Sequence, residues 1–331
     1  MKAIVIREPG GPEVLELRDV DEPSPGRGEA RVRIRATALN RADLIQRMGG
    51  YPAPPGWPRD VPGMEFAGEV DALGEGVTEF SIADRVFGLA GGGTYAEKIV
   101  VHARTLARAP KNLSFVEAAA VPEVFVTAYD ALVQARLRAG ERVLISAVGS
   151  GVGTAATQLV RALGARPFGT ARTADKIERA KSLGLEGGVV TKDARFAEAI
   201  AKIAGGPGAP SDVVDVVLEL VGGAYVAEDL ACLAPRGRIV VIGLVAGAST
   251  DVSLSSLLFK RATIIGTTLR ARPLEEKILA AKMLEREIAP LFEEKKLAPV
   301  IDRVLPLARA AEAHAAMQRN ETFGKIVLEV P

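Results

Sequence analysis

The chain has 331 residues, with 42 Lys and Arg against 41 Asp and Glu, so its formal net charge is +1. This length predicts about two domains, and the balanced charge gives no support for a nucleic-acid-binding surface or an acidic tail. The single cysteine, Cys232, excludes an intramolecular disulfide and a multi-cysteine zinc site. No apolar run approaches the roughly 18 residues of a membrane helix, and no signal-peptide core opens the chain. We therefore expect a cytoplasmic protein with neither a nucleic acid nor a membrane as partner.

The N-terminal third of the chain has the pattern of a β-rich unit. Strands are predicted over 2–7 and 30–38, where apolar and polar residues alternate. Proline- and glycine-rich segments at 51–58 and 91–93 predict turns, and 40–48 fits a short helix. Short strands between such turns suggest a barrel-like all-β unit.

The pattern changes near residue 120, and helical periodicity extends over 117–139. Strands are then expected at 142–146, 167–170, 188–191, 213–218, 238–242 and 263–268, and helices at 154–163, 174–183, 196–204 and 224–233. This alternation, with continuously apolar strands, predicts a doubly wound parallel sheet. A long helix at 274–292 follows, and a last strand at 324–330 resembles the N-terminal strands. That last strand is therefore expected to return to the first domain.

A glycine-rich turn joins the first strand of this alternation to its helix. Such a turn lets the backbone approach a dinucleotide's pyrophosphate, and the helix N-terminus supplies N–H groups. The spacing is not the literal G-x-G-x-x-G, because Gly149 and Gly151 are followed by Thr154. The alternative is a purely structural turn. The residues expected to face the pyrophosphate are Ser150, Gly151, Val152 and Gly153.

The end of the second strand bears on the choice of cofactor. An NAD site usually has an Asp or Glu there for the ribose hydroxyl. This chain has Thr170 and Arg172 instead, with Lys176 one turn later. Because Arg and Lys suit a 2′-phosphate, NADPH is the expected cofactor. The alternative is a solvated helix start.

Motifs along the whole chain resemble one known family. They are ALNRADL (38–44), PGMEFAGEV (62–70), GEGV (74–77), ADRV (83–86), AVPE (120–123), SGVGTAA (150–156), LLFKR (257–261) and GKIVLE (324–329). Together these resemble the medium-chain dehydrogenase/reductase superfamily. Within it the chain is similar to the zinc-independent quinone oxidoreductases related to zeta-crystallin, in the branch of the p53-inducible quinone oxidoreductase.

The resemblance implies an α/β protein with two domains. A GroES-like β-barrel catalytic domain would comprise 1–121 and 270–331, and a Rossmann dinucleotide-binding domain would comprise 122–269. Nicotinamide and substrate would meet in a cleft between them. The resemblance also implies a homodimer or homotetramer joined by outer strands, for which the edge strand at 261–268 is the candidate; the alternative is an ordinary covered strand.

The same resemblance bears on zinc. Zinc-dependent relatives have a Cys where this chain has Asn40, and a His where it has Met64. Neither residue completes a normal zinc site, so no metal is expected. Without a metal to stabilise an alkoxide, the chain better suits a substrate such as a quinone, which accepts hydride readily.

Three residues of the first domain are the candidate catalytic groups. By resemblance, Asn40 and Tyr51 lie near the nicotinamide and the substrate, and Tyr51 could donate a hydrogen bond to the reduced oxygen. Asp43 is the third; its alternative role is a carboxylate at a helix start. For Asn40 the alternative is a helix cap, and for Tyr51 it is loop packing. Arg47 is ranked last, as a solvated helix residue.

Further residues are expected near the cofactor. By resemblance or by their position after central strands, they are Thr127, Gly243, Leu244, Val245, Thr268, Leu269, Asn320 and Lys325. For Lys325 a surface strand position is the alternative. Thr191 stands where related reductases often have a Tyr, which weakens the expected NADPH preference. His102 and His314 lie outside these motifs and are expected to be structural or on the surface.

The main functional hypothesis is NADPH-dependent reduction of quinones by hydride transfer, without zinc. The alternative is an enoyl or α,β-unsaturated carbonyl reductase, because the same superfamily reduces activated C=C bonds. A less favoured hypothesis is a non-enzymatic, nucleotide-bound RNA-binding or structural protein, against which the balanced charge argues. A small quinone or enone is thus the expected partner.

Overall fold

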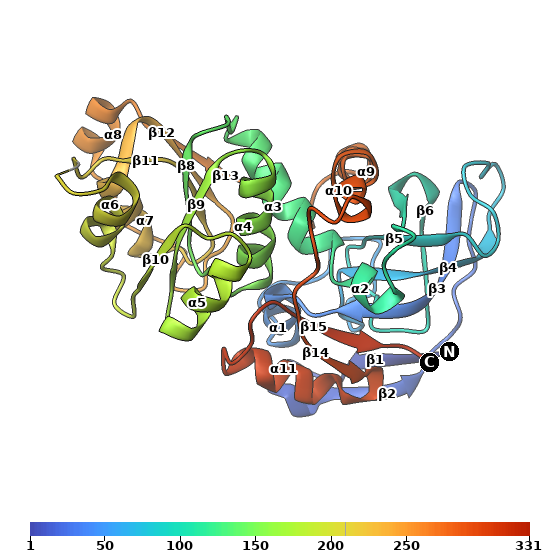
Figure 1. Ribbon diagram of the computed structural model, residues 1–331. Coiled ribbons are helices and arrows are strands. Elements are labelled where there is room, and N and C mark those ends of the chain that lie inside the picture. Colours follow the sequence, from blue (N-terminus) through green and yellow to red (C-terminus); the bar gives the residue numbers. More distant parts are fainter. Residues whose placement is uncertain (209) are drawn as a thin grey trace. The chain divides into compact units, whose positions relative to one another are not determined.

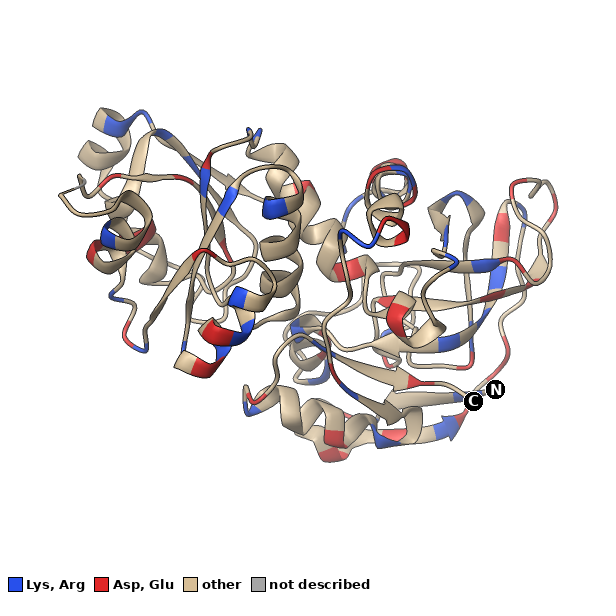
Figure 2. Cartoon of the chain, viewed as in Figure 1, with Lys and Arg blue, Asp and Glu red and all other residues tan. Residues whose placement is uncertain are grey.

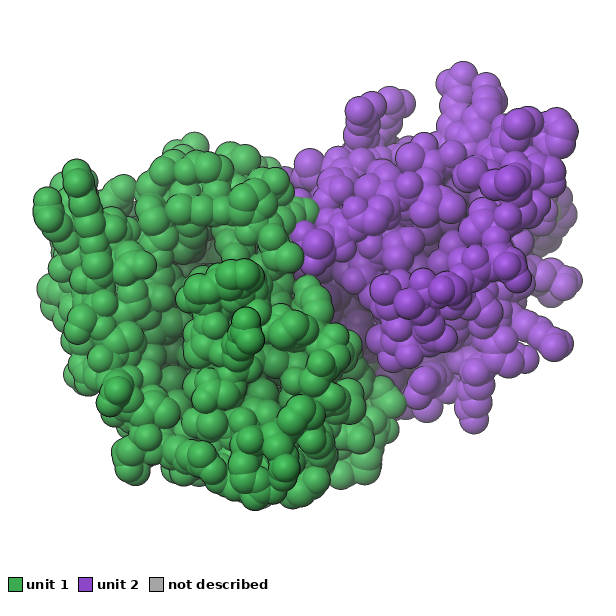
Figure 3. All heavy atoms as spheres, turned by 180° about the vertical axis from the view of Figure 1, so that it is seen from behind, with its two compact units in different colours: residues 1–126, 269–331 green, residues 127–268 purple. Residues whose placement is uncertain are grey.

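The computed structural model describes residues 1–208 and 210–331. The chain forms two compact units, one of residues 1–126 and 269–331 and the other of residues 127–268 (Figure 3). The first boundary therefore falls at Val126, where residue 121 was expected, and the second falls before Leu269. Acidic and basic residues are interspersed along both units (Figure 2).

The first unit is built on a seven-stranded sheet and a separate two-stranded sheet (Figure 1). Its strands are β1 (Lys2–Ile6), β2 (Leu15–Asp19), β3 (Glu29–Ala38), β4 (Glu65–Leu73), β5 (Arg85–Leu89), β6 (Lys98–His102), β7 (Leu106–Arg108), β14 (Ile301–Pro306) and β15 (Lys325–Glu329). The larger sheet has the order β14-β15-β3-β4-β5-β7, and β6 also pairs with β3. β1 and β2 form the antiparallel pair.

The last strand returns to the first unit, as expected. β15 pairs antiparallel with β3 and parallel with β14. Its alternate residues reach the same apolar core as those of β3, a core that includes Ile34, Phe66 and Ile326. The two ends of the chain therefore fold as one body because they share a sheet and a core.

Helices of this unit differ from expectation in two places. Its helices are α1 (Arg41–Arg47), α2 (Phe115–Ala119), α3 (Pro122–Gln134, which continues into the second unit), α9 (Leu274–Met283), α10 (Ala289–Glu293) and α11 (Ala310–Gln318). The single helix expected over 117–139 is in fact two, α2 and α3. Pro122 causes the break, because proline has no N–H and disfavours helical backbone at the residue before it. The long helix after residue 274 is interrupted by a π-helical turn, Leu284–Ile288.

The second unit has the predicted doubly wound parallel sheet. Its strands are β8 (Arg142–Ile145), β9 (Arg166–Ala171), β10 (Gly187–Val190), β11 (Val214–Glu219), β12 (Leu233–Val241) and β13 (Thr263–Gly266). They pair in parallel in the order β10-β9-β8-β11-β12-β13. Taken in sequence order this is 3-2-1-4-5-6, the arrangement of dinucleotide-binding folds.

Helices connect these strands and complete the unit. They are α4 (Gly151–Ala162), α5 (Ala174–Ser182), α6 (Ala197–Gly205), α7 (Tyr225–Cys232) and α8 (Leu254–Lys260). The strand order reverses between β8 and β11, and in open α/β sheets ligands bind beyond the carboxyl ends of strands at such a point. Across residues 1–208 and 210–331, no helix has both the length and the apolar character that a membrane crossing requires.

Candidate active site

The glycine turn after β8 lies where the strand order reverses. α4 begins at Gly151 and Ser150 is its N-cap, whose Oγ accepts a hydrogen bond from the N–H of Gly153 (3.0 Å). The helix therefore starts earlier than the expected residue 154. This N-terminus, with Gly151 and Val152 in its first turn, fits a pyrophosphate by its N–H groups and its dipole.

Gly153 is required for a different reason from phosphate approach. A Cβ at this position would lie 2.4 Å from the carbonyl oxygen of Ala147 and 2.7 Å from Cα of Val148. Gly153 thus fills the role of close helix–strand packing that the third glycine has in dinucleotide-binding turns. Gly169 on β9 has a related role, because its Cβ would lie 2.0 Å from Cγ1 of Val148.

The three residues expected at the 2′-phosphate have different environments. Thr170 is buried, and its Oγ1 accepts a hydrogen bond from the N–H of Ala147 (3.4 Å). This bond holds the glycine-rich turn after β8 in place. Arg172 is exposed just beyond β9, and Lys176 is half-buried in α5. Arg172 and Lys176 therefore have the accessibility that a phosphate contact needs, while such a contact by any of the three stays a prediction.

A buried carboxylate that sequence reasoning missed ties this turn to the neighbouring strand. Glu219, fully buried at the end of β11, accepts hydrogen bonds from Ser146 Oγ (2.6 Å) and from the N–H groups of Val221 (2.5 Å) and Gly222 (2.6 Å). The sequence does contain a signal that could have revealed Glu219: an acidic residue ends an apolar strand shortly before two glycines. Glu219 therefore fixes the carboxyl ends of β8 and β11 at the place where the cofactor is expected.

The loop after β12 is held against the loop after β11. Gly222 and Gly247 form a β-bridge, and a Cβ on Gly243 would lie 2.4 Å from the carbonyl oxygen of Leu220. The side chains of Leu244 and Val245 are 55% and 56% exposed. These two apolar residues are thus open to a ligand, as a nicotinamide contact requires.

The remaining expected cofactor residues vary in exposure. Thr268 is exposed, Leu269 is half-buried and Thr127 is buried on α3. Asn320 has a positive φ of 58°, and its Oδ1 accepts a hydrogen bond from Arg41 (2.7 Å). Their cofactor contacts stay predictions.

In the first unit, three buried polar side chains meet at the start of α1. The ammonium of Lys325 donates to Asn40 Oδ1 (2.7 Å) and to the carbonyl of Leu39 (2.5 Å), and it forms an ion pair with Glu65 Oε1 (2.7 Å). Asn40 Nδ2 donates to the same Glu65 oxygen (2.8 Å). All three ammonium hydrogens of Lys325 therefore have an acceptor, so Lys325 orients Asn40 and Glu65. It is 3% exposed, which overturns the surface alternative.

Asp43 links this group to a second series of buried side chains that are joined by hydrogen bonds. Its Oδ2 accepts from the N–H of Asn40 (2.8 Å) and from Tyr95 OH (3.2 Å), and its Oδ1 accepts from the N–H of Gly63 (3.2 Å). Asp43 is thus the helix-start carboxylate foreseen as its alternative role, and it also holds Asn40. Whether it touches a substrate stays a prediction.

This second series of hydrogen-bonded side chains corrects one expectation and contains one residue that was missed. Tyr95 OH is 3.2 Å from Nε2 of His314, and Nδ1 of that ring is 3.3 Å from Arg47 Nη1. Arg47 is fully buried, where a solvated residue was expected, because Gly10, Gln318 and His314 supply its partners. Tyr95 was missed altogether, since an isolated Tyr in a loop gives no periodic signal.

Burial sets the ionisation of this region. It raises the pKa of Asp43 to about 6, although the hydrogen bond from the Asn40 N–H acts to lower this pKa. It also raises the pKa of Glu123 to about 8, with a further rise from the charge of Glu65. Burial beside Arg47 lowers the pKa of His314 to about 3. At neutral pH, Glu123 therefore carries a proton and His314 is uncharged.

Tyr51 is held by a buried arginine. The guanidinium of Arg270 donates to the carbonyls of Tyr51 (3.0 Å) and Gly91 (2.8 Å) and to Oε1 of Gln46 (2.5 Å), and it lies 5.0 Å from the centre of the Tyr51 ring. Helix α1 and two loops of the first unit thus meet at one cation. Arg270, which sequence reasoning missed, positions the proline-rich segment that carries Tyr51.

The donor set does not fit a zinc ion. The Asn40 amide is bonded to Lys325 and Glu65, Met64 is a buried thioether, and the charge of Glu65 is neutralised by Lys325. Within residues 1–208 and 210–331, no group of three or more His, Cys, Asp or Glu side chains is placed to hold a metal.

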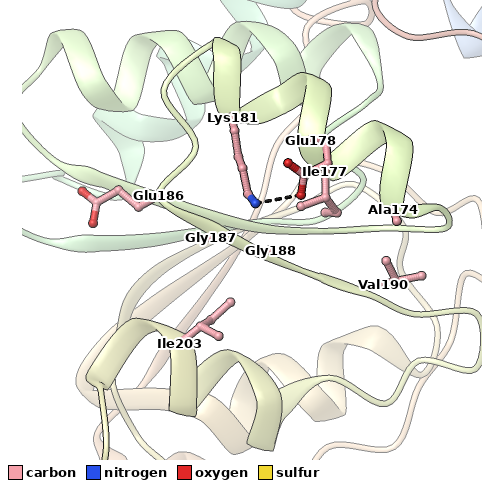
Figure 4. Close-up of a pocket in the computed structure, with 9 residues that line it drawn as sticks. All are labelled: Ala174, Ile177, Glu178, Lys181, Glu186, Gly187, Gly188, Val190 and Ile203. Atoms are coloured by element: carbon pink, nitrogen blue, oxygen red, sulfur yellow. Dashed lines mark hydrogen bonds and ion pairs between the residues drawn. The ribbon is translucent and has the colours of Figure 1, made fainter.

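A surface hollow of about 340 Å³ lies elsewhere, beside the edge strand β10 (Figure 4). Its lining includes Ile177 and Lys181 of α5, Val190 of β10 and Ile203 of α6. None of the expected cofactor or catalytic residues lines it, so it is not the candidate site.

Comparisons with known proteins agree with both halves of this description. Residues 26–111 match the alcohol dehydrogenase GroES-like domain, and residues 151–285 match a family described as zinc-binding dehydrogenase. The chain is 32% identical to the quinone oxidoreductase of Homo sapiens and 36% identical to that of Pseudomonas aeruginosa; these alignments cover 99% and 96% of this chain and 97% and 96% of the relatives. It is also 34% identical, over 98% of its length, to 15% of a mycocerosic acid synthase-like polyketide synthase of Mycobacterium tuberculosis.

Solved structures give the same picture of the fold. An NAD-dependent alcohol dehydrogenase matches with a TM-score of 0.86 and 36% identity, covering 100% of both chains. A mycobacterial protein solved in complex with NADPH matches with a TM-score of 0.85 and 29% identity, covering 99% of this chain and 100% of that one. The expected GroES-like and Rossmann architecture is thereby confirmed, and the fold is one that binds NAD(P).

Proposed function

Because the chain belongs to the medium-chain dehydrogenase/reductase superfamily and is similar to its quinone oxidoreductases, we propose that it reduces quinones with NADPH, without zinc. We place it in the branch of the p53-inducible quinone oxidoreductase. The observation that carries the proposal is the buried group of Asn40, Glu65 and Lys325. By resemblance, Asn40 stands where zinc-dependent relatives have a cysteine ligand, and together with Glu65 and Lys325 it forms a donor set that zinc does not favour. This supports a substrate that accepts hydride without a Lewis acid.

Under this proposal, separate residues of the chain bind the cofactor and the substrate. Arg172 and Lys176 hold the 2′-phosphate, the first turn of α4 holds the pyrophosphate, and Leu244 and Val245 contact the nicotinamide. NADPH, when bound, supplies the hydride. Tyr51 donates a hydrogen bond to the quinone oxygen that gains negative charge, and Arg270 keeps its loop in place. Asn40, fixed by Lys325 and Glu65, orients the substrate.

The test is oxidation of NADPH by the purified protein with an ortho-quinone as acceptor and NADH as the control cofactor. We expect rapid loss of nicotinamide absorbance with NADPH and little with NADH. Tyr51→Phe and Asn40→Ala should each lower turnover about tenfold, the effect of one lost hydrogen bond at the site. Tight NADPH binding without turnover would contradict quinone reduction.

A second candidate is reduction of an activated C=C bond in an enone or a 2-enoyl thioester. It is supported by the match to a segment of a mycocerosic acid synthase-like polyketide synthase. Turnover of an enoyl thioester far above that of any quinone would favour this activity.

A further inference from the structure

The polar group around Asn40 contains three carboxyl groups, and two of them are fully engaged. Oε1 of Glu65 is shared by Lys325 and Asn40, and its Oε2 accepts from the N–H of Glu123 (2.8 Å). Asp43 accepts from two backbone N–H groups and from Tyr95. Both residues have 0% exposure, so neither carboxyl can reach a ligand.

Glu123 differs from both in its position. Its backbone N–H is anchored on Glu65, which fixes the first turn of α3 against the group. Its own carboxyl has no hydrogen bond and no ion pair within residues 1–208 and 210–331, and the residue remains partly exposed. Thr127, expected near the nicotinamide ribose, follows one turn later on the same helix. Glu123 is thus the open carboxyl at the edge of an otherwise satisfied cluster.

Charged groups on four neighbouring segments act on this carboxyl. Glu65 on β4 and Asp43 on α1 favour its protonated form, whereas Lys325 on β15 and Arg270 favour the carboxylate. Burial and the charge of Glu65 prevail and raise the pKa to about 8. The carboxyl therefore holds a proton at neutral pH and can release it at modest cost, as a general acid must.

We propose that Glu123 is the proton donor of the reduction, delivering the proton that balances the hydride; this rests on the proposed function. The hydride adds to the acceptor, and one of its oxygens becomes an anion. The O–H bond of Glu123 breaks, its proton joins that anion, and the Glu123 carboxylate then takes a proton from water. A quinone, NADPH and H⁺ thereby become a hydroquinone and NADP⁺.

Other titratable groups of the first unit are poorer donors. His314 is fully buried, and its low pKa leaves it without a proton to give at neutral pH. Tyr95 is also fully buried, and burial raises its pKa well above the ordinary value. Tyr51 has the separate role of donating a hydrogen bond to the quinone oxygen in the proposed function.

The experiment compares Glu123→Gln with Glu75→Gln, an exposed glutamate in a turn of the same unit. Turnover with NADPH is followed from pH 6 to about 10 with two acceptors, a quinone and an enone. We expect Glu123→Gln to lower kcat by about 100-fold with the enone. The loss should be smaller with the quinone, whose reduced anion is stabilised by its ring. The fall of wild-type kcat above about pH 8 should disappear in this variant.

Two further measurements separate a proton donor from a structural residue. NADPH affinity and the thermal unfolding midpoint should be similar in Glu123→Gln and Glu75→Gln. Infrared difference spectra should show a protonated carboxyl in the wild type that titrates near pH 8 and is absent from Glu123→Gln.

The outcomes distinguish the two proposals. An active wild type with unchanged kcat and pH profile in Glu123→Gln overturns the proton donor alone. A wild type that binds NADPH but reduces neither acceptor overturns the proposed function and the donor role with it.

Discussion

Single buried residues in the first unit have charge states that their sequence neighbourhood does not reveal. Arg47 and His314 come from segments far apart in the chain, yet their side chains meet in the core at 3.3 Å. Because the cation and the desolvated ring face each other, the ring stays neutral. Desolvation and the charge of Glu65 likewise raise the pKa of the partly exposed Glu123 to about 8. The chemistry of this region thus depends on packing rather than on residue type.

A first prediction concerns His314. Its folded-state pKa of about 3 lies below the ordinary 6.5, so the unfolded chain binds more protons between these values. The contribution of the neutral ring to the free energy of unfolding is therefore fully present above about pH 6.5. It is lost as pH falls below this value, by at most about 1.4 kcal/mol per pH unit. His314→Gln should have a shallower loss of unfolding free energy than the wild type in urea titrations between pH 7 and about 4.5.

The comparison isolates the ring, because the raised pKa of Asp43 acts in the opposite direction in both proteins and cancels in the difference. His102→Gln, at the other histidine, is the matched control. Equal slopes in His314→Gln and the wild type would show that the ring is not held neutral by burial.

The strand–turn–helix element from β8 to α4 is determined by close backbone approach. The first turn of α4 passes so near Ala147 and Val148 that a side chain at Gly153 has no space. Glu219 holds the same turn from the neighbouring strand through Ser146. The geometry of the expected pyrophosphate site is therefore built from backbone contacts and one buried carboxylate.

The second prediction is that Gly153→Ala displaces α4. The added carbon would lie 2.4 Å from a backbone oxygen that cannot move independently, which should cost about 1–3 kcal/mol of stability. NADPH affinity, measured by fluorescence titration, should fall more than tenfold because the N–H groups of the first turn move with the helix. Gly266→Ala is the control, since nothing lies within 4 Å of its added carbon. Equal NADPH affinity in both variants would contradict this account.

At the scale of the whole molecule, the second unit has an open sheet edge. β13 is the terminal strand of the six-stranded sheet, with Ile264 37% exposed on it. The preceding helix α8 exposes Leu254, Leu258 and Phe259 by 75%, 68% and 80%. Unpaired edges beside apolar surface favour association. We propose that a second copy of this chain covers this edge in a homodimer or homotetramer.

Light scattering during size-exclusion chromatography tests this proposal. We expect the wild type to elute as a dimer or tetramer, and Ile264→Lys to shift the protein to a smaller species. A charged side chain facing an apolar partner is costly to bury. Ile82→Lys, at an exposed isoleucine of the first unit, should leave the assembly unchanged. A monomeric wild type would refute the proposal.

The sequence by itself determined the doubly wound sheet, the glycine turn at α4 and the return of β15 to the first unit. The first two features depend on local periodicity and on turn residues, which a single chain segment contains, and the third was inferred from the likeness of the last strand to the N-terminal strands. Only the tertiary structure decided that Lys325 neutralises Glu65 beside Asn40, that Arg270 holds the Tyr51 loop and that Glu219 joins two strand ends. These contacts link residues far apart in the chain, so they arise from strand order and register, and burial then sets their ionisation.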